Sequence, residues 1–273
     1  GVVLITTNTG GEGRTQVHLN VSDGFQQVSK KLDLLNTSQM EWIRQQYEGD
    51  AYEPLPEPYA GTDINWQDQV FRQGFTQDYG LSISGGNKKT QFMFSGNFVD
   101  QEGIVISSGY QKASANLNLD HSINDYIQIK NNLVASRSQW DGVYTDSWHG
   151  GSDGSILQTA LSMPPYFPKE DESGNLMFYQ DFPVYDIERR LFRNPIAIAE
   201  GLENNKVYDR FMDNLSVNLQ ITDNLVFKTT AGIDYANVGI DLLEGTKYRI
   251  YAKDERIRAR KVNRKRINWV NEN

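Results

Sequence analysis

The sequence predicts an all-β chain, specifically a portion of an antiparallel transmembrane β-barrel whose long extracellular loops contain short helices. Three observations support this fold class. Apolar and polar residues alternate over several segments, which is the period of a half-exposed strand. The connections between those segments are short and long in turn. Aromatic residues, among them Phe98, Tyr126 and Tyr235, lie near segment ends, where the girdles of membrane proteins lie.

The chain opens with an apolar run from Gly1 to Thr7 that is typical of a buried strand, followed by a glycine-rich connector that indicates a domain boundary. Val17, Leu19 and Val21 then alternate with polar residues and predict the first strand of the alternating set.

The next segment predicts two short helices. Ser38 to Glu41 has the spacing of a capping box, and Met40, Ile43 and Tyr47 recur at helical intervals, so we expect a helix from Ser38 to Tyr47. Asp63 is the expected cap of a second short helix that contains Trp66.

The clearest alternation runs from Asp78 to Ser138 and predicts four consecutive strands. Gly85 to Lys88 has the composition of a tight hairpin turn between the first two. The apolar residues of all four strands should share one face, which would face lipid in a barrel. The residues expected there are Leu81, Ile83, Phe92, Phe94, Leu117, Leu119 and Ile129.

A connection of about 70 residues, from Gln139 to Arg210, is expected next, which is far above usual loop lengths. It should contain a helical turn before Pro164 and another that begins at Pro195, with Asn194 as its N-cap. Residues 215–221 and 225–235 predict a further hairpin, and a less regular segment follows from Lys247.

The order of these connections separates two architectures. Because antiparallel neighbours reverse direction, all short turns fall on one edge of the sheet and all long loops on the other. Outer-membrane barrels sort their connections in this way. The alternative is a self-contained soluble antiparallel β-sandwich that acts as a binding module.

Composition limits the function classes. Only 38% of the 273 residues are hydrophobic, and no apolar run approaches the roughly 18 residues of a membrane helix. The net charge of −8 argues against nucleic-acid binding, and the absence of cysteine removes disulfide and thiolate chemistry. Because the chain starts and stops within strand-like patterns, we expect it to be a fragment of a longer protein.

Several motifs, in order, resemble the SusC/RagA family of TonB-dependent outer-membrane transporters. They are Gly1–Thr7, Leu34-Leu35-Asn36, Asp63–Asp68, Ser82–Thr90, Asp100–Val105, Leu117–His121, Asn194-Pro195 and Trp269–Asn273. The segment Asp63–Asp68 departs from the family's Thr-Asp-Trp-Gln-Asp motif by one inserted residue. These motifs span nearly the whole chain.

The resemblance implies a barrel of roughly 22 strands filled by an N-terminal plug, of which about eight strands lie in this chain. Residues 1–8 would be the last plug strand, 9–13 a linker, and 14–273 the incomplete N-terminal part of the barrel. The implied activity is import of an oligosaccharide or peptide across the bacterial outer membrane. The implied partners are a SusD-like surface lipoprotein, the TonB complex, which acts on a segment outside this sequence, and outer-membrane lipid with its lipopolysaccharide.

Candidate contacts with the solute are the aromatic residues and one histidine in the longest predicted loop, because aromatic faces stack on sugar rings and peptide side chains. They are Trp140, Tyr144, Trp148, His149, Tyr166 and Phe167. The alternative is that these side chains pack the loop against its neighbours or against the lipoprotein.

No catalytic residue, cofactor site or metal site is expected, since the sequence has no phosphate loop, zinc spacing or nucleophile elbow. A basic run near the C-terminal end is interrupted by Asp254 and Glu255, and is expected to be a solvated strand end or a contact for lipopolysaccharide phosphates. It comprises Lys253, Arg256, Arg258, Arg260, Lys261, Arg264, Lys265 and Arg266.

Overall fold

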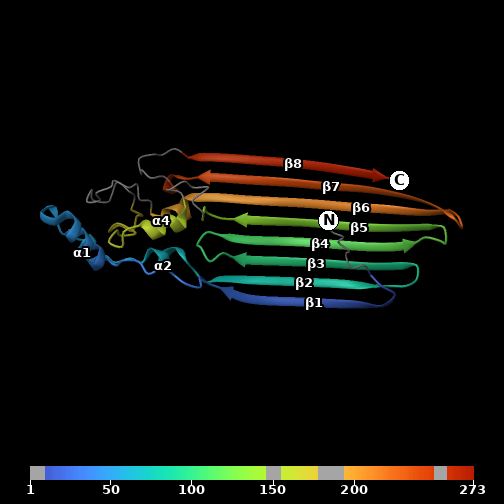
Figure 1. Cartoon of the computed structure of the whole chain (residues 1–273), viewed down its shortest axis with the longest axis horizontal. Coiled ribbons are helices and arrows are strands. Elements are labelled where there is room, and N and C mark those ends of the chain that lie inside the picture. The colour runs from blue at the N-terminus through green and yellow to red at the C-terminus, as the bar shows by residue number, and fades with distance from the viewer. Residues whose placement is uncertain (1–9, 146–154, 178–193, 249–256) are drawn as a thin grey trace.

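The computed structural model describes residues 10–145, 155–177, 194–248 and 257–273. Eight strands form one antiparallel sheet in which each strand pairs with the next along the chain (Figure 1). The strands are β1 Gly13–Gln26, β2 Gly74–Gly86, β3 Thr90–Glu102, β4 Gly109–Ser122, β5 Ile127–Asp141, β6 Leu202–Thr222, β7 Leu225–Glu244 and β8 Arg258–Glu272. The predicted all-β, antiparallel fold class is confirmed.

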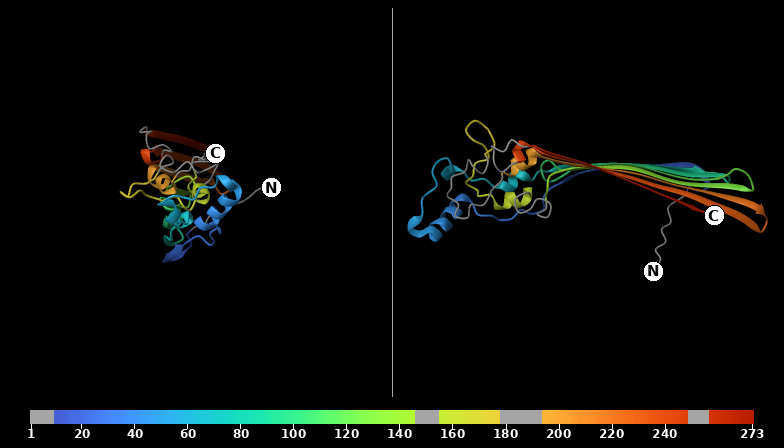
Figure 2. Two further views of the ribbon diagram at one scale, coloured as in Figure 1. Left: turned by 90° about the vertical axis from the view of Figure 1, so that its left-hand side faces the viewer. Right: turned by 90° about the horizontal axis from the view of Figure 1, so that it is seen from above.

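The connections are sorted as the sequence predicts. Tight turns join β2 to β3, β4 to β5 and β6 to β7, and Figure 1 places them at one end of the sheet. The longer connections all leave the opposite end. The sheet is a long single layer in Figure 2, with no second sheet packed on it among the described strands.

The strand register places alternate residues on two chemically different faces. Ile83 pairs with Phe94, Phe94 with Leu117, and Leu117 with Leu133. Because directly opposite residues of an antiparallel pair share a face, these side chains form an apolar row across four strands. All seven residues expected to face lipid lie on this apolar face.

The helices gather beyond the loop end of the sheet and form what we call the loop module (Figure 1). They are α1 Thr37–Glu48, α2 Trp66–Val70, α4 Ile156–Ser162 and α5 Pro195–Gly201, with 3₁₀ turns at η1 Gly49–Ala51, η2 Tyr59–Gly61 and η5 Thr246–Tyr248. None of the helices in the described residues is long and apolar enough to cross a membrane.

The hydrophobic core lies mainly in the loop module rather than along the sheet. Trp66, Val70, Ile156 and Ile198 are almost completely buried, whereas most strand residues are half-buried or exposed. The long connections therefore pack on one another, and the two faces of the sheet stay open.

Two predictions about helix starts need correction. Helix α1 begins at Thr37, because Asn36 rather than Ser38 forms the capping box, with Gln39. Asn65 rather than Asp63 caps α2, since its side chain accepts from the Gln67 amide. Asp63 instead accepts hydrogen bonds from the amide and hydroxyl of Thr37, at 2.9 and 3.1 Å. The predicted cap at Asn194 and the first helical position at Pro195 are confirmed.

The long connection is shorter than predicted. Strand β5 continues to Asp141 and β6 already begins at Leu202. The first residues of β6 include Asn204, Asn205 and Lys206, which are polar on both faces. The apolar alternation therefore fades before the strand ends, which hid this part of the strand from sequence reasoning.

Candidate functional site

The polar face of the sheet is a continuous network of side chains across neighbouring strands. Asn116 Nδ2 of β4 donates to Ser95 Oγ of β3 at 3.2 Å, and Asn132 of β5 donates to Asn118. Near the short turns, Gln128 Nε2 donates to Asp120 Oδ1 at 2.8 Å. Because these side chains satisfy one another's hydrogen bonds, they form a stable polar surface that water or a polar solute can contact.

A charged cluster continues the polar face across β6, β7 and β8. Arg210 Nε lies 3.2 Å from Asp234 Oδ1, and Arg266 Nη2 lies 3.8 Å from Asp234 Oδ2. One carboxylate thus faces two guanidinium groups. The surplus positive charge on this part of the face would attract anionic groups that approach it.

The segment that leads into β1 lies against the same polar face. Gly10 sits so close to β3 that a Cβ there would be 2.2 Å from the Phe92 carbonyl oxygen, so only glycine fits. Its other neighbours include Asn118 and Asn132 of the polar network. The chain therefore reaches the first strand from the polar side of the sheet.

A polar pair interrupts the apolar face, in addition to a polar group nearer the loops formed by Arg137, Asp209 and Asn237. Asn131 Nδ2 of β5 donates to Asp213 Oδ1 of β6 at 2.6 Å. By register, Asp213 lies between Leu133 and Ile233 in an otherwise apolar row. The hydrogen bond satisfies both groups, which makes their position tolerable outside water.

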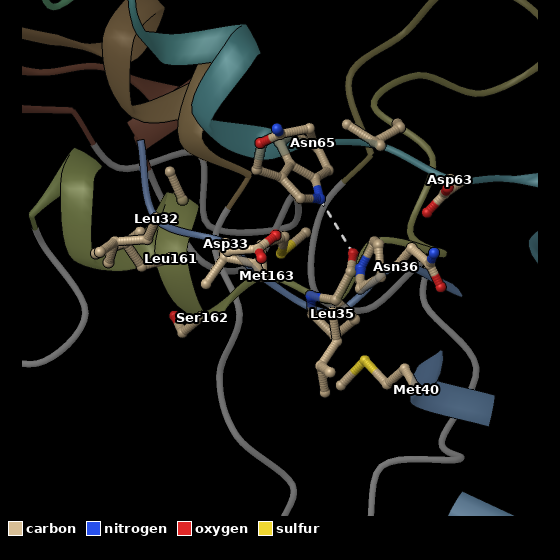
Figure 3. A pocket seen from close by; sticks show the side chains of 16 residues that line it. Leu32, Asp33, Leu35, Asn36, Met40, Asp63, Asn65, Leu161, Ser162 and Met163 are labelled. Atoms are coloured by element: carbon tan, nitrogen blue, oxygen red, sulfur yellow. Dashed lines mark hydrogen bonds between the residues drawn. The ribbon is translucent and has the colours of Figure 1, made fainter. Parts of the chain in front are cut away.

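Trp66 holds the loop module together. Its indole Nε1 donates to the Pro164 carbonyl at 3.0 Å, a bond that joins α2 to the segment just after α4 in the longest connection (Figure 3). A groove of about 340 Å³ lies beside it, lined by Leu32, Leu35, Met40 and Met163 among others. The segment 32–36 lies over this groove, and Leu32 exchanges two hydrogen bonds with the side chain of Gln67.

The candidate aromatic residues occupy different environments. Tyr166 and Phe167 are 3% and 2% exposed and stack edge to face in the core of the loop module. Tyr144 packs against that core from its edge, and burial raises the pKa of its hydroxyl. Trp148 and His149 lie outside the described residues.

The expected position of Trp140 in the loop was wrong, because it lies in strand β5. It pairs with Tyr110 of β4, and the two ring centroids are 5.2 Å apart. By register both rings lie on the polar face, and Trp140 is exposed. Trp140 and Tyr110 therefore form an accessible aromatic pair on the polar face, at the end of the sheet next to the loop module.

The basic run forms strand β8 from Arg258 onward, at the edge of the sheet. Lys261 Nζ lies 3.2 Å from Asp241 Oδ1, and Arg258 Nη1 lies 3.7 Å from Glu244 Oε2. Lys253 and Arg256 lie outside the described residues. Within the described ranges, no cluster of histidine, aspartate or glutamate has the arrangement of a metal site.

Comparisons with known proteins agree with this arrangement. No protein-family model matches the chain. TonB-dependent receptor P3 of Formosa agariphila is 29% identical over 249 residues, which cover 90% of this chain and 23% of that protein. TonB-dependent receptor SusC of Bacteroides thetaiotaomicron is 30% identical over 169 residues, which cover 62% of this chain and 16% of SusC.

Solved structures share the fold. The RagAB peptide importer in its closed-closed state superposes with a TM-score of 0.71 at 17% identity, over 96% of this chain and 32% of that chain. A second structure, of the RagAB peptide transporter, gives the same TM-score at 19% identity.

These sequence relatives and the sorted sheet define the chain as a homologue of TonB-dependent receptors. Within that class, the resemblance to the SusC/RagA family that the motifs predicted is confirmed. These relatives are receptors and transporters rather than enzymes. The chain spans about a quarter of the length of P3 and about a third of the RagAB chain.

Proposed function

We propose that the protein to which this chain belongs imports an oligosaccharide or a peptide across the bacterial outer membrane, driven by the TonB complex. The chain supplies consecutive wall strands of the channel and part of its extracellular loops. A SusD-like surface lipoprotein covers the outer mouth of this SusC-like channel. The relatives support the class of activity, since they are TonB-dependent receptors.

The observation that carries this proposal is a single sheet with one apolar face and one polar face. Among the described residues, neither face is covered by a second sheet. An apolar face built from residues such as Phe94 and Leu117 is suited to lipid, and the opposite network is suited to a water-filled lumen with a plug. On the same reading, cations of β8 near the loops would meet lipopolysaccharide phosphates.

We propose the domain division that the family resemblance implies, with residues 1–8 as the last strand of the plug, 9–13 as the linker and 14–273 as part of the barrel. Residues 1–9 lie outside the described residues. The position of Gly10 against the polar network supports a linker that enters from the lumen side. The soluble sandwich is the less favourable alternative, because a sandwich needs two packed sheets.

Among the solute-contact candidates, Trp140 has the geometry that fits the role best. It is exposed on the polar face beside Tyr110, whereas Tyr166 and Phe167 already fill the loop core. We propose that Trp140, with Tyr144, Trp148 and His149 nearby in sequence, contacts the solute. Replacing Trp140 with alanine in the full-length transporter should weaken solute binding and leave the folded fraction unchanged, and unchanged affinity would refute this role.

Uptake measurements test the proposed activity. Cells that depend on the full-length transporter should accumulate labelled oligosaccharide or labelled peptide, and accumulation should stop when the TonB complex is removed. Comparing the two solute classes in the same strain identifies the cargo. Uptake that persists without TonB, or a transporter that purifies as a monodisperse protein without detergent, would contradict the proposal.

A further inference from the structure

Helix α1 has the reverse of the usual polarity of a surface helix. Its charged residues turn inward: the side chain of Arg44 is 11% exposed, and that of Glu48 is 12% exposed. Met40 packs against the core of the loop module, but the other large apolar residues turn outward, with Trp42 63% and Tyr47 76% exposed. Surface helices normally bury the apolar stripe and expose the charges.

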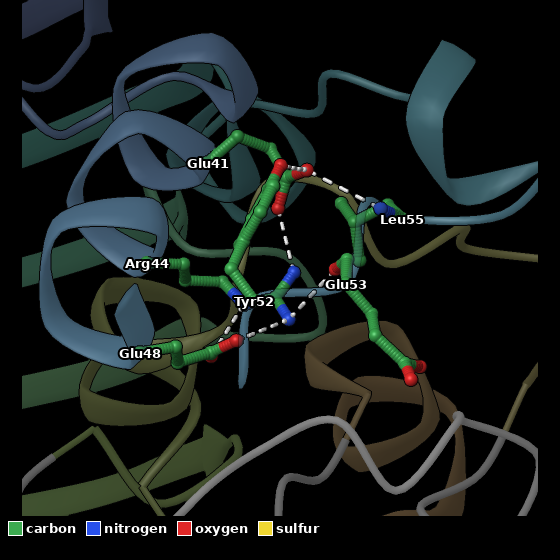
Figure 4. A network of polar contacts seen from close by, with 6 residues as sticks. All are labelled: Glu41, Arg44, Glu48, Tyr52, Glu53 and Leu55. Carbon is green, nitrogen blue, oxygen red and sulfur yellow. Dashed lines mark hydrogen bonds and ion pairs between the residues drawn. The ribbon is translucent and has the colours of Figure 1, made fainter. Parts of the chain in front are cut away.

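The inward charges pair with one another and with the segment that follows the helix (Figure 4). Arg44 Nη1 lies 2.6 Å from Glu41 Oε1, and Arg44 Nε lies 3.2 Å from Glu48 Oε1. Glu41 also accepts from the Tyr52 hydroxyl at 2.8 Å. This bond raises the pKa of Tyr52. Turning the apolar stripe inward would break the bonds that tie Glu41 to Tyr52 and to the Leu55 amide, whereas the two Arg44 pairs lie within the helix.

The outward face has the composition of a protein interface. At 100° per residue, Trp42, Ile43 and Tyr47 lie within less than half of the helix circumference. Gln39 and Gln46 lie between them, and no charged residue of α1 falls on that arc. Interface cores are enriched in aromatic residues and depleted of charges, whereas a solvated face carries charges.

The surroundings of this face indicate what covers it. In Figures 1 and 2, α1 lies at the end of the loop module farthest from the sheet. In the proposed channel that end is the one farthest from the membrane, so a lipid surface is a poor occupant and a protein that lies over the outer mouth is a good one.

We infer that the outward face of α1, formed by Trp42, Ile43 and Tyr47, is a docking surface for the surface lipoprotein that covers the channel mouth. This inference rests on the proposed function, which supplies the lipoprotein. Trp42, Ile43 and Tyr47 are then the side chains that the lipoprotein contacts.

Photo-crosslinking in the full-length transporter tests the inference, with a benzophenone amino acid placed at Trp42 or Tyr47 in the native outer membrane. The matched control is Gln45, which is exposed on the same helix but lies off the apolar arc. We expect an adduct with the lipoprotein from positions 42 and 47 and little from position 45. Adducts only within the transporter, adducts with a second copy of it, or no adduct while the lipoprotein still co-purifies would overturn the inference alone.

A binding measurement gives an independent check. The W42A/Y47A variant should bind the purified lipoprotein about 30-fold more weakly or worse, as expected for interface aromatic residues, while Gln45→Ala should bind as the parent does. Both changed side chains are exposed, so thermal unfolding should not change. Unaltered affinity of W42A/Y47A would overturn the docking surface, whereas a parent transporter that binds no lipoprotein would overturn the lipoprotein partnership itself.

Discussion

Placing an arginine on the apolar face tests whether that face meets lipid. Phe94 is the most informative position, because it lies midway between Thr90 and Phe98 on this face of β3. The distance along the strand from Thr90 to Phe98 is about 27 Å. A tilt of roughly 40° reduces this to about 20 Å across the membrane, close to the height of the apolar band in such barrels. Phe94 is therefore near the midplane.

The expected cost of Phe94→Arg is about 2 to 4 kcal/mol in the free energy of unfolding, or a factor of about 30 to 700 in the folding equilibrium. The matched control is Met93→Arg in the same strand. Met93 pairs with Ser84 and Asn118 on the polar face, where an arginine remains hydrated and should cost little.

Denaturant unfolding of the full-length transporter in phospholipid vesicles measures both variants. Equal losses for Phe94→Arg and Met93→Arg, or no loss for Phe94→Arg, would refute the assignment of faces.

Three further predictions concern single interactions. Asn131→Leu should lower the free energy of unfolding by about 1 to 3 kcal/mol, because it leaves the Asp213 carboxylate without its donor on the apolar face. The double variant N131L/D213L should recover most of that loss when unfolding is measured in vesicles. A double variant as unstable as the single one would contradict the pairing. Trp66→Phe should cost about 0.5 to 1.5 kcal/mol, because the buried Pro164 carbonyl loses its indole donor and keeps only the 3.3 Å bond from the Phe167 amide. Limited proteolysis should then cut the loop module faster, whereas exposed Trp42→Phe serves as the control and should not change the rate. Hydrogen bonds from the Asn175 side chain and amide lower the pKa of the Asp171 carboxyl in the folded chain. The turn held by this carboxylate should therefore be fully stable above the pKa of about 4 that aspartate has in the unfolded chain. It should loosen as the pH falls through the lower pKa of the folded chain. Hydrogen exchange at the Ser173 and Asn175 amides checks this, and exchange that is independent of pH across that range after correction for the intrinsic rate would contradict it.

The sheet could be predicted from the sequence because its two faces differ in chemistry over most strands. The alternation of Leu81 and Ile83 with serines assigns the two faces of β2 from its own sequence, and the register with β3 agrees with that assignment. The loop ends of β5 and β6 could not be predicted in this way, since Asn204, Asn205 and Lys206 carry polar groups to both faces. Beyond the apolar band, side chains of either face meet water, and the two-residue period disappears.

The candidate site was harder to predict because it depends on contacts between distant segments. Helical spacing grouped Met40, Ile43 and Tyr47 but could not tell that Met40 packs against the loop module while Ile43 and Tyr47 face outward. That depends on Glu41, whose partners Tyr52 and Leu55 lie beyond the helix. Likewise, Tyr166 and Phe167 were recognised as aromatic loop residues, but their burial follows from packing with distant residues such as Tyr59.

The proposed function requires that the apolar face of this sheet meets lipid and that its polar face lines a water-filled lumen. Single cysteines at each position from 91 to 98 can carry a nitroxide label in the full-length transporter in vesicles, once any cysteine outside these 273 residues, which contain none, has been replaced. Collision rates with oxygen, which concentrates in lipid, and with a water-soluble nickel complex should alternate along β3. Positions 92, 94, 96 and 98 should favour oxygen, and positions 91, 93, 95 and 97 should favour nickel. Equal accessibility on both faces, or the opposite alternation, would contradict the central claim.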